Sequence, residues 1–263
     1  MKCRLCGNDK LKLYYTQGNN DEYLFYKCNV CKLINYDLNG GLDQVKYGNT
    51  YIDPYDEKNK MNITQTKTYN FIKSHLKLKG KIIDIGCGNG RLLYLFKNDG
   101  WDVKGLELSP LLTKSVKDTL NIDVEVANFL NYNYINKDKF DVVVLRHVIE
   151  HLPDPILALT QINLILKKDS YAVLEFPNID GLDLKFKRLI QRCNIYKKKY
   201  GENYKPGHCN EYSKQSFEYL ALKMGFKVIV WETYSHKPLS DLIYNRIKVG
   251  NKARAIIKKV NDI

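Results

Sequence analysis

The segment Lys81–Leu93, KIIDIGCGNGRLL, constrains the fold of this chain more than any other stretch. It opens with the apolar run KIIDI, continues through the glycine-rich GCGNG and leads into RLLYLFK, which has the pattern of a helix. A strand, a glycine turn and a helix in this order form the first half of a nucleotide-binding βαβ unit. Glycines let a ligand approach the backbone, and the start of the following helix offers unpaired N–H groups.

Strand-like and helix-like segments alternate after this turn, which is typical of an α/β protein with a mostly parallel sheet. The sequence predicts further strands at residues 101–107, 123–127, 140–145, 171–176 and 226–233. It predicts helices at residues 62–76, 91–97, 109–120, 154–166 and 213–225. In the tail, spaced apolar residues that include Ile256 and Ile257 fit a helical stripe better than a strand, but the pattern leaves both a helix and a further strand open.

Two features beside the glycine turn narrow the class of cofactor. The third glycine of G-x-G-x-G comes one residue earlier than in the dinucleotide motif G-x-G-x-x-G. Glu107 ends the next expected strand, seventeen residues after Gly90, near the offset at which an acid binds ribose hydroxyls. With Asp84 ahead of it, D-I-G-C-G-N-G resembles the first motif of class I S-adenosylmethionine (SAM) methyltransferases. RHVIEHLPDP at residues 146–155 resembles their small-molecule branch, which includes ubiquinone-biosynthesis O-methyltransferases and many sugar methyltransferases.

This resemblance implies a Rossmann-like class I methyltransferase sheet and methyl transfer from SAM. It assigns the cofactor to residues that follow the strand ends, namely Asp84, Gly86, Cys87, Gly88, Asn89, Gly90, Glu107, Leu108, Asn128, Phe129 and Arg146. Family members usually carry an acid that accepts from the adenine amine where this chain has Asn128. The amide oxygen of Asn128 can still accept that hydrogen bond.

Four of the seven cysteines form two C-x2-C pairs, Cys3/Cys6 and Cys28/Cys31, separated by twenty-one residues. This is the spacing of a zinc ribbon, in which four thiolates hold one structural Zn²⁺ and leave no open coordination position. Two β-like runs around the turn residues GNND predict a hairpin between the pairs. Free thiols or a redox C-x-x-C are the alternatives.

The sequence divides into a zinc ribbon at 1–38, a linker and entry helix at 39–78, and a methyltransferase domain at 79–263. The first ten residues, MKCRLCGNDK, contain no apolar signal-peptide core, and no apolar run approaches the length of a membrane span. We therefore expect a soluble cytoplasmic protein, in a compartment where thiols stay reduced.

Histidines follow the fourth expected strand, where the carboxyl ends of parallel strands line a ligand crevice. A sugar hydroxyl is weakly acidic, and a neutral histidine is suited to accept its proton near neutral pH. His151 is the first candidate base, with His147 beside it and His208 as the next candidate. Glu150 could orient an imidazole, as a buried acid orients a catalytic histidine. Each of the four could instead be structural.

The same residues spell H-x-x-E-H, the signature of inverzincin metalloproteases. That function needs both histidines on one face of a stable helix. Pro153 and Pro155 follow at once and leave little room for a helix. The sequence therefore disfavours a protease.

The net charge of +13 is concentrated in two stretches of the chain. Residues 184–205 contain eight basic residues and one acidic residue, and residues 242–261 contain six basic residues and none that is acidic. Clustered basic residues favour an anionic partner. We expect the first stretch, which is partly helical, to bind phosphate on the methyl acceptor. The second, with its apolar stripe, is expected to contact an anionic membrane.

The sequence thus predicts an O-methyltransferase that acts on a phosphate-bearing sugar, nucleotide- or lipid-linked, in glycan or surface-polysaccharide biosynthesis. One alternative is an RNA methyltransferase whose ribbon recognises its substrate. The charge of residues 1–38 is nearly balanced, which makes a nucleic-acid partner the weaker prediction. A catalytically silent SAM-binding module is a further alternative, disfavoured by the intact glycine motif, Glu107 and the nearby histidines.

Overall fold

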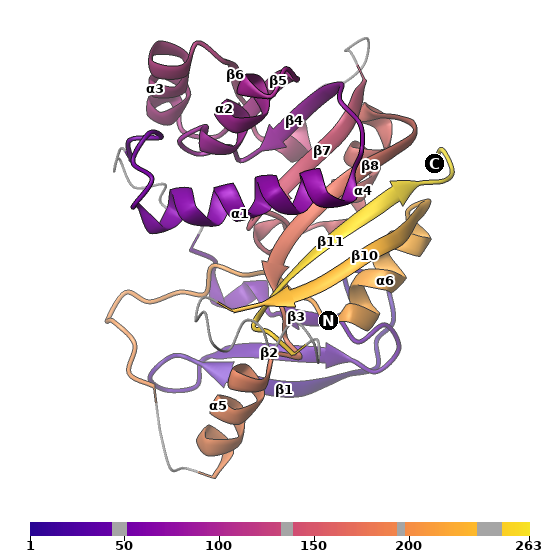
Figure 1. Cartoon of the computed structure of the whole chain (residues 1–263). Coiled ribbons are helices and arrows are strands. Elements are labelled where there is room, and N and C mark those ends of the chain that lie inside the picture. The colour runs from indigo at the N-terminus through magenta and orange to yellow at the C-terminus, as the bar shows by residue number, and fades with distance from the viewer. Residues whose placement is uncertain (44–51, 133–138, 194–197, 236–248) are drawn as a thin grey trace. The chain divides into compact units, whose positions relative to one another are not determined.

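The chain is described by a computed structural model that covers residues 1–43, 52–132, 139–193, 198–235 and 249–263 (Figure 1). It folds into two compact units, each assembled from several segments. The first unit comprises Met1–Lys46, His147–Leu159 and Leu174–Ile257, and the second comprises Tyr47–Arg146, Thr160–Val173 and Lys258–Ile263. The domain boundaries expected from the sequence stay a prediction.

Two sheets contain the described strands. The smaller has the order β1-β2-β3-β9 and the larger the order β10-β11-β8-β7-β4-β5-β6. The strands of the smaller sheet are β1 Leu11–Gln17, β2 Tyr23–Cys28, β3 Ile34–Tyr36 and β9 Asn210–Glu211. Those of the larger are β4 Lys81–Ile85, β5 Asp102–Glu107, β6 Asp123–Val126, β7 Phe140–Arg146, β8 Leu166–Pro177, β10 Phe226–Tyr234 and β11 Lys252–Lys259. Strand β4 pairs in parallel with β5 and β7, and β5 with β6, which confirms the predicted α/β fold.

Helices connect the strands as the sequence pattern predicts. They are α1 Lys60–His75, α2 Arg91–Asn98, α3 Pro110–Leu120, α4 Pro155–Ile165, α5 Leu182–Arg192 and α6 Lys214–Lys223, with 3₁₀ turns η1 Leu38–Gly40, η2 Phe129–Asn131 and η3 Ile149–His151. Ser109 caps α3 by accepting from the Leu112 N–H, and Ser213 and Ser216 form a capping box at α6. Such caps satisfy N–H groups that a helix start leaves unpaired.

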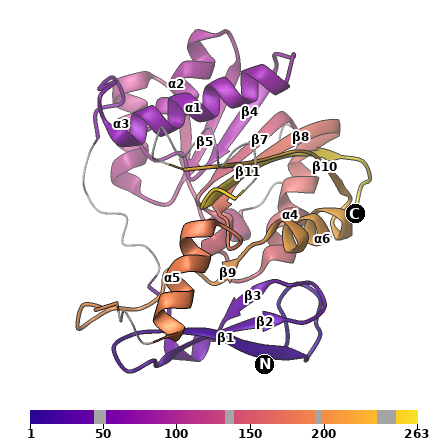
Figure 2. The same cartoon turned by 60° about the horizontal axis from the view of Figure 1, so that its bottom comes forward.

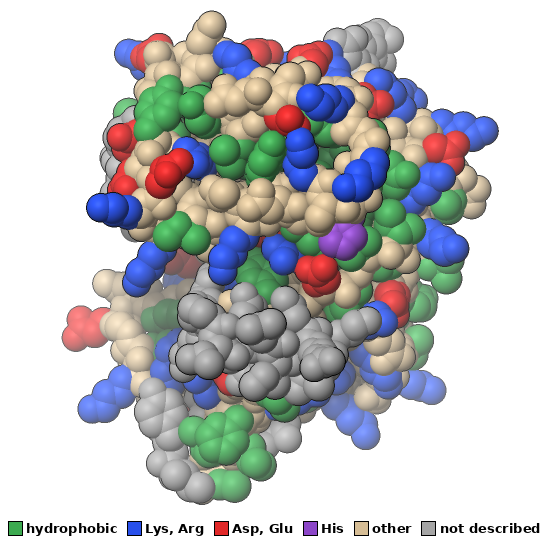
Figure 3. Space-filling model, viewed as in Figure 1, with side chains coloured by type: hydrophobic (Ala, Val, Ile, Leu, Met, Phe, Trp, Pro, Cys, Tyr) green, Lys and Arg blue, Asp and Glu red, His purple; other side chains and the backbone are tan. Residues whose placement is uncertain are grey.

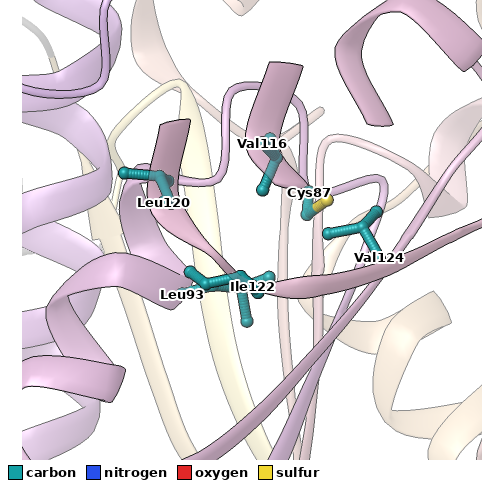
Figure 4. Close-up of a cluster of buried hydrophobic side chains, with 6 residues drawn as sticks. All are labelled: Cys87, Leu93, Val116, Leu120, Ile122 and Val124. Atoms are coloured by element: carbon teal, nitrogen blue, oxygen red, sulfur yellow. The ribbon is translucent and has the colours of Figure 1, made fainter. Parts of the chain in front are cut away.

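In the second unit, the glycine turn packs against a cluster of buried apolar side chains, to which its own Cys87 belongs (Figure 4). Cys87, Leu93, Val116, Leu120, Ile122 and Val124 form this cluster. A Cβ atom on Gly90 would lie 2.8 Å from Val116 Cγ1, so only glycine lets α3 pack this closely against the turn. Burial of the cluster therefore fixes the turn between β4 and α2.

In the first unit, the N-terminal hairpin is joined to residues far along the chain, as Figure 2 shows. Strand β3 pairs with β9, whose register places Ile34 opposite Glu211. The guanidinium of Arg4 donates to the Tyr36 and Cys209 carbonyls and to Asn210 Oδ1. The segment that contains His208 is thereby held against the cysteine-bearing part of the chain.

In the tail, where the sequence favoured a helix but left a strand open, residues 252–259 form strand β11. Ala253, Ala255, Ile256 and Ile257 are fully buried. Lys259 is also buried, and its Nζ donates to the Asn163 and Leu166 carbonyls. Of the apolar residues that suggested membrane contact, Ile256 and Ile257 are buried whereas Val260 is 46% exposed, and contact with a membrane stays a prediction. Residues 242–248 of that basic stretch lie outside the described residues. Among the helices that the structure describes, none is long and apolar enough to cross a bilayer.

Candidate functional site

The glycine turn has the backbone that its sequence predicts. Gly86, Gly88 and Gly90 have φ angles of 73°, 57° and 74°, a left-handed region in which side chains are strained. A Cβ on Gly88 would meet one atom within 4 Å, Met61 Cε at 3.6 Å. The backbone at Gly88 is therefore open to the close approach of a ligand.

Glu107 lies at the end of β5 and holds the turn in place. Its Oε2 accepts from the Gly88 N–H at 2.9 Å, and its Oε1 accepts from Leu108 and Ser109 at 2.8 and 3.0 Å. The side chain is 1% exposed. A carboxylate offers about four lone-pair positions, so Oε2 retains the capacity to accept from a ligand hydroxyl.

The predicted cofactor residues beside this turn play different parts. Asp84 is buried at the end of β4. The side chain of Cys87 points into the apolar cluster, and burial raises the pKa of its thiol, so only its backbone is suited to a ligand (Figure 4). Asn89 is buried in a polar network that sequence reasoning did not anticipate.

That network comes from the polar face of α1. Asn89 Oδ1 accepts from Gln65 Nε2 at 3.0 Å, and Asn89 Nδ2 donates to Asn62 Oδ1 at 2.8 Å. Gln65 Oε1 also accepts from the Leu92 N–H at the start of α2. Asn62, Gln65 and Thr68 are all at most 2% exposed. These three polar residues recur every third position and so share one face of α1, and that spacing was the signal in the sequence that could have indicated the network.

The other predicted cofactor residues belong to the same unit. Leu108 is exposed, Phe129 is buried, and Asn128 is exposed with its Oδ1 accepting from the Leu130 N–H at 3.1 Å. Arg146, the last residue of β7, donates from Nε to Thr68 Oγ1 at 2.9 Å. Asn128 therefore caps a turn, and Arg146 is tied to the polar face of α1.

The four paired cysteines come together in the first unit. Sγ atoms of Cys3 and Cys31 lie 3.4 Å apart, those of Cys6 and Cys28 lie 3.5 Å apart, and all four lie within 4.8 Å of one another. Sulfur atoms around a tetrahedral zinc with bonds of about 2.3 Å stand roughly 3.8 Å apart. The positions immediately after each pair, Gly7 and Lys32, have positive φ angles of 73° and 66°. Two matched turns thus present a donor set that fits zinc.

His147, Glu150, His151 and His208 also come together in the first unit. His147 has a positive φ of 54°, and only Ile149–His151 form a single 3₁₀ turn, so H-x-x-E-H does not lie on a helix. The Lys252 ammonium lies 3.2 Å from His147 Nε2, which must accept, so Nδ1 carries the proton and donates to Glu150 Oε1. Both ring nitrogens of His147 are therefore occupied.

His151 has a different environment. Its Nδ1 lies 2.8 Å from the Gly207 carbonyl, which can only accept, so the proton is on Nδ1 and Nε2 keeps a lone pair. Glu150 was a candidate to orient this imidazole, but its bond goes to His147 and the Gly207 carbonyl takes that role. Of His147 and His151, His151 is thus the one whose Nε2 lone pair has no partner among the described residues.

Glu150 and His208 have their pKa values lowered for different reasons and differ in charge at neutral pH. Burial alone would raise the pKa of Glu150, but the bond from His147 and the neighbouring histidines lower it, so Glu150 stays ionised. Burial lowers the pKa of His208 below 6.5, so His208 is neutral at neutral pH. The rings of His151 and His208 meet edge to face, 4.9 Å apart. Both line a pocket of about 530 Å³ within the first unit.

Comparison with known proteins agrees with this architecture. Ubiquinone biosynthesis O-methyltransferase of Haemophilus ducreyi is 28% identical over 139 residues, which is 48% of this chain and 58% of that protein. The tRNA U34 carboxymethyltransferase of Sulfurimonas denitrificans is 31% identical over 120 residues, 43% of this chain and 40% of that protein. The chain thus spans about half the length of these curated relatives.

Solved structures share the fold. A Pyrococcus horikoshii protein matches 81% of this chain and 95% of its own with a TM-score of 0.58 at 17% identity. Magnesium protoporphyrin IX methyltransferase from Synechocystis, solved with bound SAH, covers 75% of this chain and 82% of its own with a TM-score of 0.52 at 12% identity. Residues 55–230 match the family described as "Methyltransferase domain", and because they make up more than half of the 263 residues, this chain belongs to that family.

Proposed function

We propose that this chain transfers a methyl group from SAM to a hydroxyl of a small anionic acceptor, a sugar that carries phosphate. The observation that supports this acceptor most is that the imidazoles of His151 and His208 line one pocket that also contains lysines. SAM, when bound, supplies an electrophilic methyl group. A hydroxyl must lose its proton as it attacks, and a nearby neutral imidazole supplies the base.

In this mechanism, Nε2 of His151 accepts the hydroxyl proton. The Gly207 carbonyl holds the Nδ1–H tautomer, so the lone pair faces away from that bond. The ionised Glu150 stabilises the imidazolium that forms, since its carboxylate lies within 4.8 Å of the nitrogens of His151 and His208. A buried carboxylate stabilises an imidazolium without taking its proton.

The second unit would hold the cofactor. The open backbone at Gly88 fits a closely approaching ligand, and Oε2 of Glu107 can accept from a ribose hydroxyl. Leu108 is 47% exposed beside Glu107, which suits it to pack against a cofactor ring. Zinc on Cys3, Cys6, Cys28 and Cys31 would be structural, because four thiolates complete its coordination.

The first experiment supplies tritiated methyl SAM with two acceptor sets, nucleotide-linked hexoses and bulk tRNA. We expect label in the sugars, with kcat lowered about 10²- to 10⁴-fold in His151→Gln, because general-base catalysis contributes that much. His75→Gln is the matched control, because His75 lies on α1 in the second unit and is not part of the cluster. Unchanged kcat in His151→Gln would exclude His151 as the base.

Methylation of tRNA is the second candidate, favoured by the match to the tRNA U34 carboxymethyltransferase. On the face shown in Figure 3, lysine and arginine side chains are interspersed with acidic ones, so that face offers no continuous basic surface of the kind RNA binding uses. Label that enters tRNA and not the sugars would establish this candidate and overturn the first.

Stability should fall between pH 7.5 and pH 5.5 because of His208. Burial lowers its pKa in the folded protein below the unfolded value of 6.5, so the unfolded chain binds more protons in this range. The free energy of unfolding therefore decreases as pH falls. Urea titrations at both pH values should show a smaller decrease in His208→Gln than in wild type. An equal decrease in both would show that His208 titrates normally.

A further inference from the structure

The pocket beside His151 and His208 combines cations with aromatic rings, and the N-terminal hairpin forms one of its walls. Its lining comes from β1, β2, α5 and residues 198–211, together with His151 and Pro177, all within the first unit. Figure 2 shows α5 alongside the hairpin. The pocket contains the charged residues Lys187, Arg188, Lys198 and Glu211 together with Tyr15, Phe25, Tyr200 and Tyr204.

The acid in this lining is already engaged. Glu211 Oε2 lies 3.3 Å from Arg188 Nη2, and Glu211 Oε1 accepts from the Tyr15 hydroxyl at 2.7 Å. Lys187 forms no ion pair with a described residue, and Lys198 lies over the Tyr200 ring at 4.7 Å. Nη1 of Arg188 is buried and has no hydrogen-bond partner among the described residues. The pocket thus keeps an excess of positive charge that its own acid does not neutralise.

The hairpin also positions the opposite wall. Asn19 Nδ2 donates to the Tyr200 carbonyl, and the Tyr200 N–H donates to Asn19 Oδ1, both at 3.0 Å. The Tyr204 hydroxyl donates to Gln17 Oε1. Tyr15 stacks on Phe25 at 4.4 Å and lies under the Arg188 guanidinium at 4.6 Å. The cysteine-bearing hairpin therefore fixes both the arginine and the segment that carries Lys198.

We propose that this pocket binds the phosphate of the methyl acceptor, and that the ribbon hairpin is a working part of the acceptor site. Only the identification of the ligand as the methyl acceptor rests on the proposed function; phosphate binding in the pocket does not. Phosphate would contact Lys187 and Lys198, while the remainder of the molecule extends along the tyrosine rings toward His151 and His208. Charge-assisted bonds to a phosphate are the strong contacts such residues make. Lys197 of the same basic stretch lies outside the described residues.

Calorimetry on the full zinc-loaded chain tests this with pyrophosphate, UDP-glucose and uncharged glucose as probes. We expect UDP-glucose to compete with pyrophosphate and glucose to leave it bound. Lys187→Glu should raise the Kd for pyrophosphate about tenfold or more, since it replaces an attractive charge by a repulsive one. Lys185→Glu is the matched control, because Lys185 lies on the same helix, pairs with Asp180 and does not line the pocket.

A second variant tests the hairpin. Asn19→Ala should weaken pyrophosphate binding without changing the Kd for SAM, because it removes both bonds to Tyr200. If Lys187→Glu and Lys185→Glu weakened pyrophosphate binding equally, the binding would reflect general charge attraction and the inference would be overturned. Wild-type protein that does not bind pyrophosphate would also overturn the inference. A chain that binds pyrophosphate here but methylates no sugar would retain the pocket and overturn the proposed acceptor. If the protein methylated sugars but Lys187→Glu left pyrophosphate binding unchanged, the proposed acceptor would stand and the phosphate pocket would be overturned.

Discussion

The double substitution Cys3→Ser/Cys28→Ser is expected to abolish zinc binding and to lower Tm by roughly 10–20 °C. One ligand is removed from each C-x2-C pair, so neither pair can hold the ion alone. Structural zinc sites contribute folding free energy directly, of order 10 kcal/mol in isolated finger peptides. A loss of about 5 kcal/mol in a chain of this size corresponds to the stated change in Tm. Metal analysis should find one zinc per wild-type chain and none in the variant.

We expect the hairpin to depend on the metal because its own core is small. Phe25, Ile34, Tyr36 and Ile179 form that core, and Asn35 beside them is fully buried and polar. Segments of about 40 residues rarely bury enough apolar surface to fold without such support. Loss of zinc should therefore also weaken pyrophosphate binding in the pocket that the hairpin lines.

Cys193→Ser is the control for this experiment, since Cys193 is exposed and lies outside the cluster. We expect it to retain one zinc and an unchanged Tm. Retention of zinc by the double variant would show that the cysteines are not its ligands. If a chelator stopped methyl transfer at once while Tm stayed constant, the zinc would be catalytic and the structural assignment wrong.

Local sequence signals predicted the parts of this protein that local chemistry determines. The glycines of the turn have positive φ angles that most side chains disfavour, and Ser109 and Ser213 occupy cap positions that few side chains satisfy. Buried parallel strands such as β7 are continuous apolar runs, so the sequence pattern predicted their positions. The convergence of four cysteines was predictable for a similar reason, because the spacing of metal ligands is itself a local pattern.

Contacts between distant segments could not be predicted in this way. Strands β3 and β9 are three and two residues long, too short for a periodic pattern, and their pairing joins residues far apart in the chain. The sequence left the tail open between a helix and a strand for a related reason, because a strand buried on both faces shows no alternation. In β11 the consecutive Ala255, Ile256 and Ile257 are all buried, a run that a helix and a buried strand share.

The roles within the histidine cluster were unpredictable for the same physical reason. Sequence placed Glu150 between two histidines, but the partner of each imidazole depends on the fold. The Gly207 carbonyl reaches His151 from a residue 56 positions away. Lys252, from β11, reaches His147 in the same way. A carbonyl and an ammonium brought by distant segments thus decide which histidine keeps a free lone pair.

Gly88→Ala is expected to raise the Kd for SAM about tenfold or more. The added methyl group would meet only Met61 Cε at 3.6 Å, so the turn has room for it when no ligand is bound. The same space is where a cofactor would approach the backbone, and the methyl group would displace it. Gly100→Ala is the matched control, because Gly100 also has a positive φ, of 79°, and its added Cβ would meet only Lys79 Nζ at 3.9 Å. Both variants carry the strain of a left-handed alanine, about 1–2 kcal/mol.

Glu107→Ala tests the same site from the other side of the turn. Its carboxylate accepts from the Gly88, Leu108 and Ser109 N–H groups, and removal leaves those donors without their acceptor. We expect SAM binding to weaken by about 1–3 kcal/mol, the cost of poorly paired ribose hydroxyls and a looser turn. Calorimetry and Tm should be measured together, so that loss of SAM binding is distinguished from loss of stability. Gly100→Ala is the reference for stability alone: it should lower Tm as Gly88→Ala does and leave the Kd for SAM unchanged. If SAM bound equally to wild type, Gly88→Ala and Glu107→Ala, the cofactor would lie elsewhere, and the open backbone at Gly88 would have a different ligand.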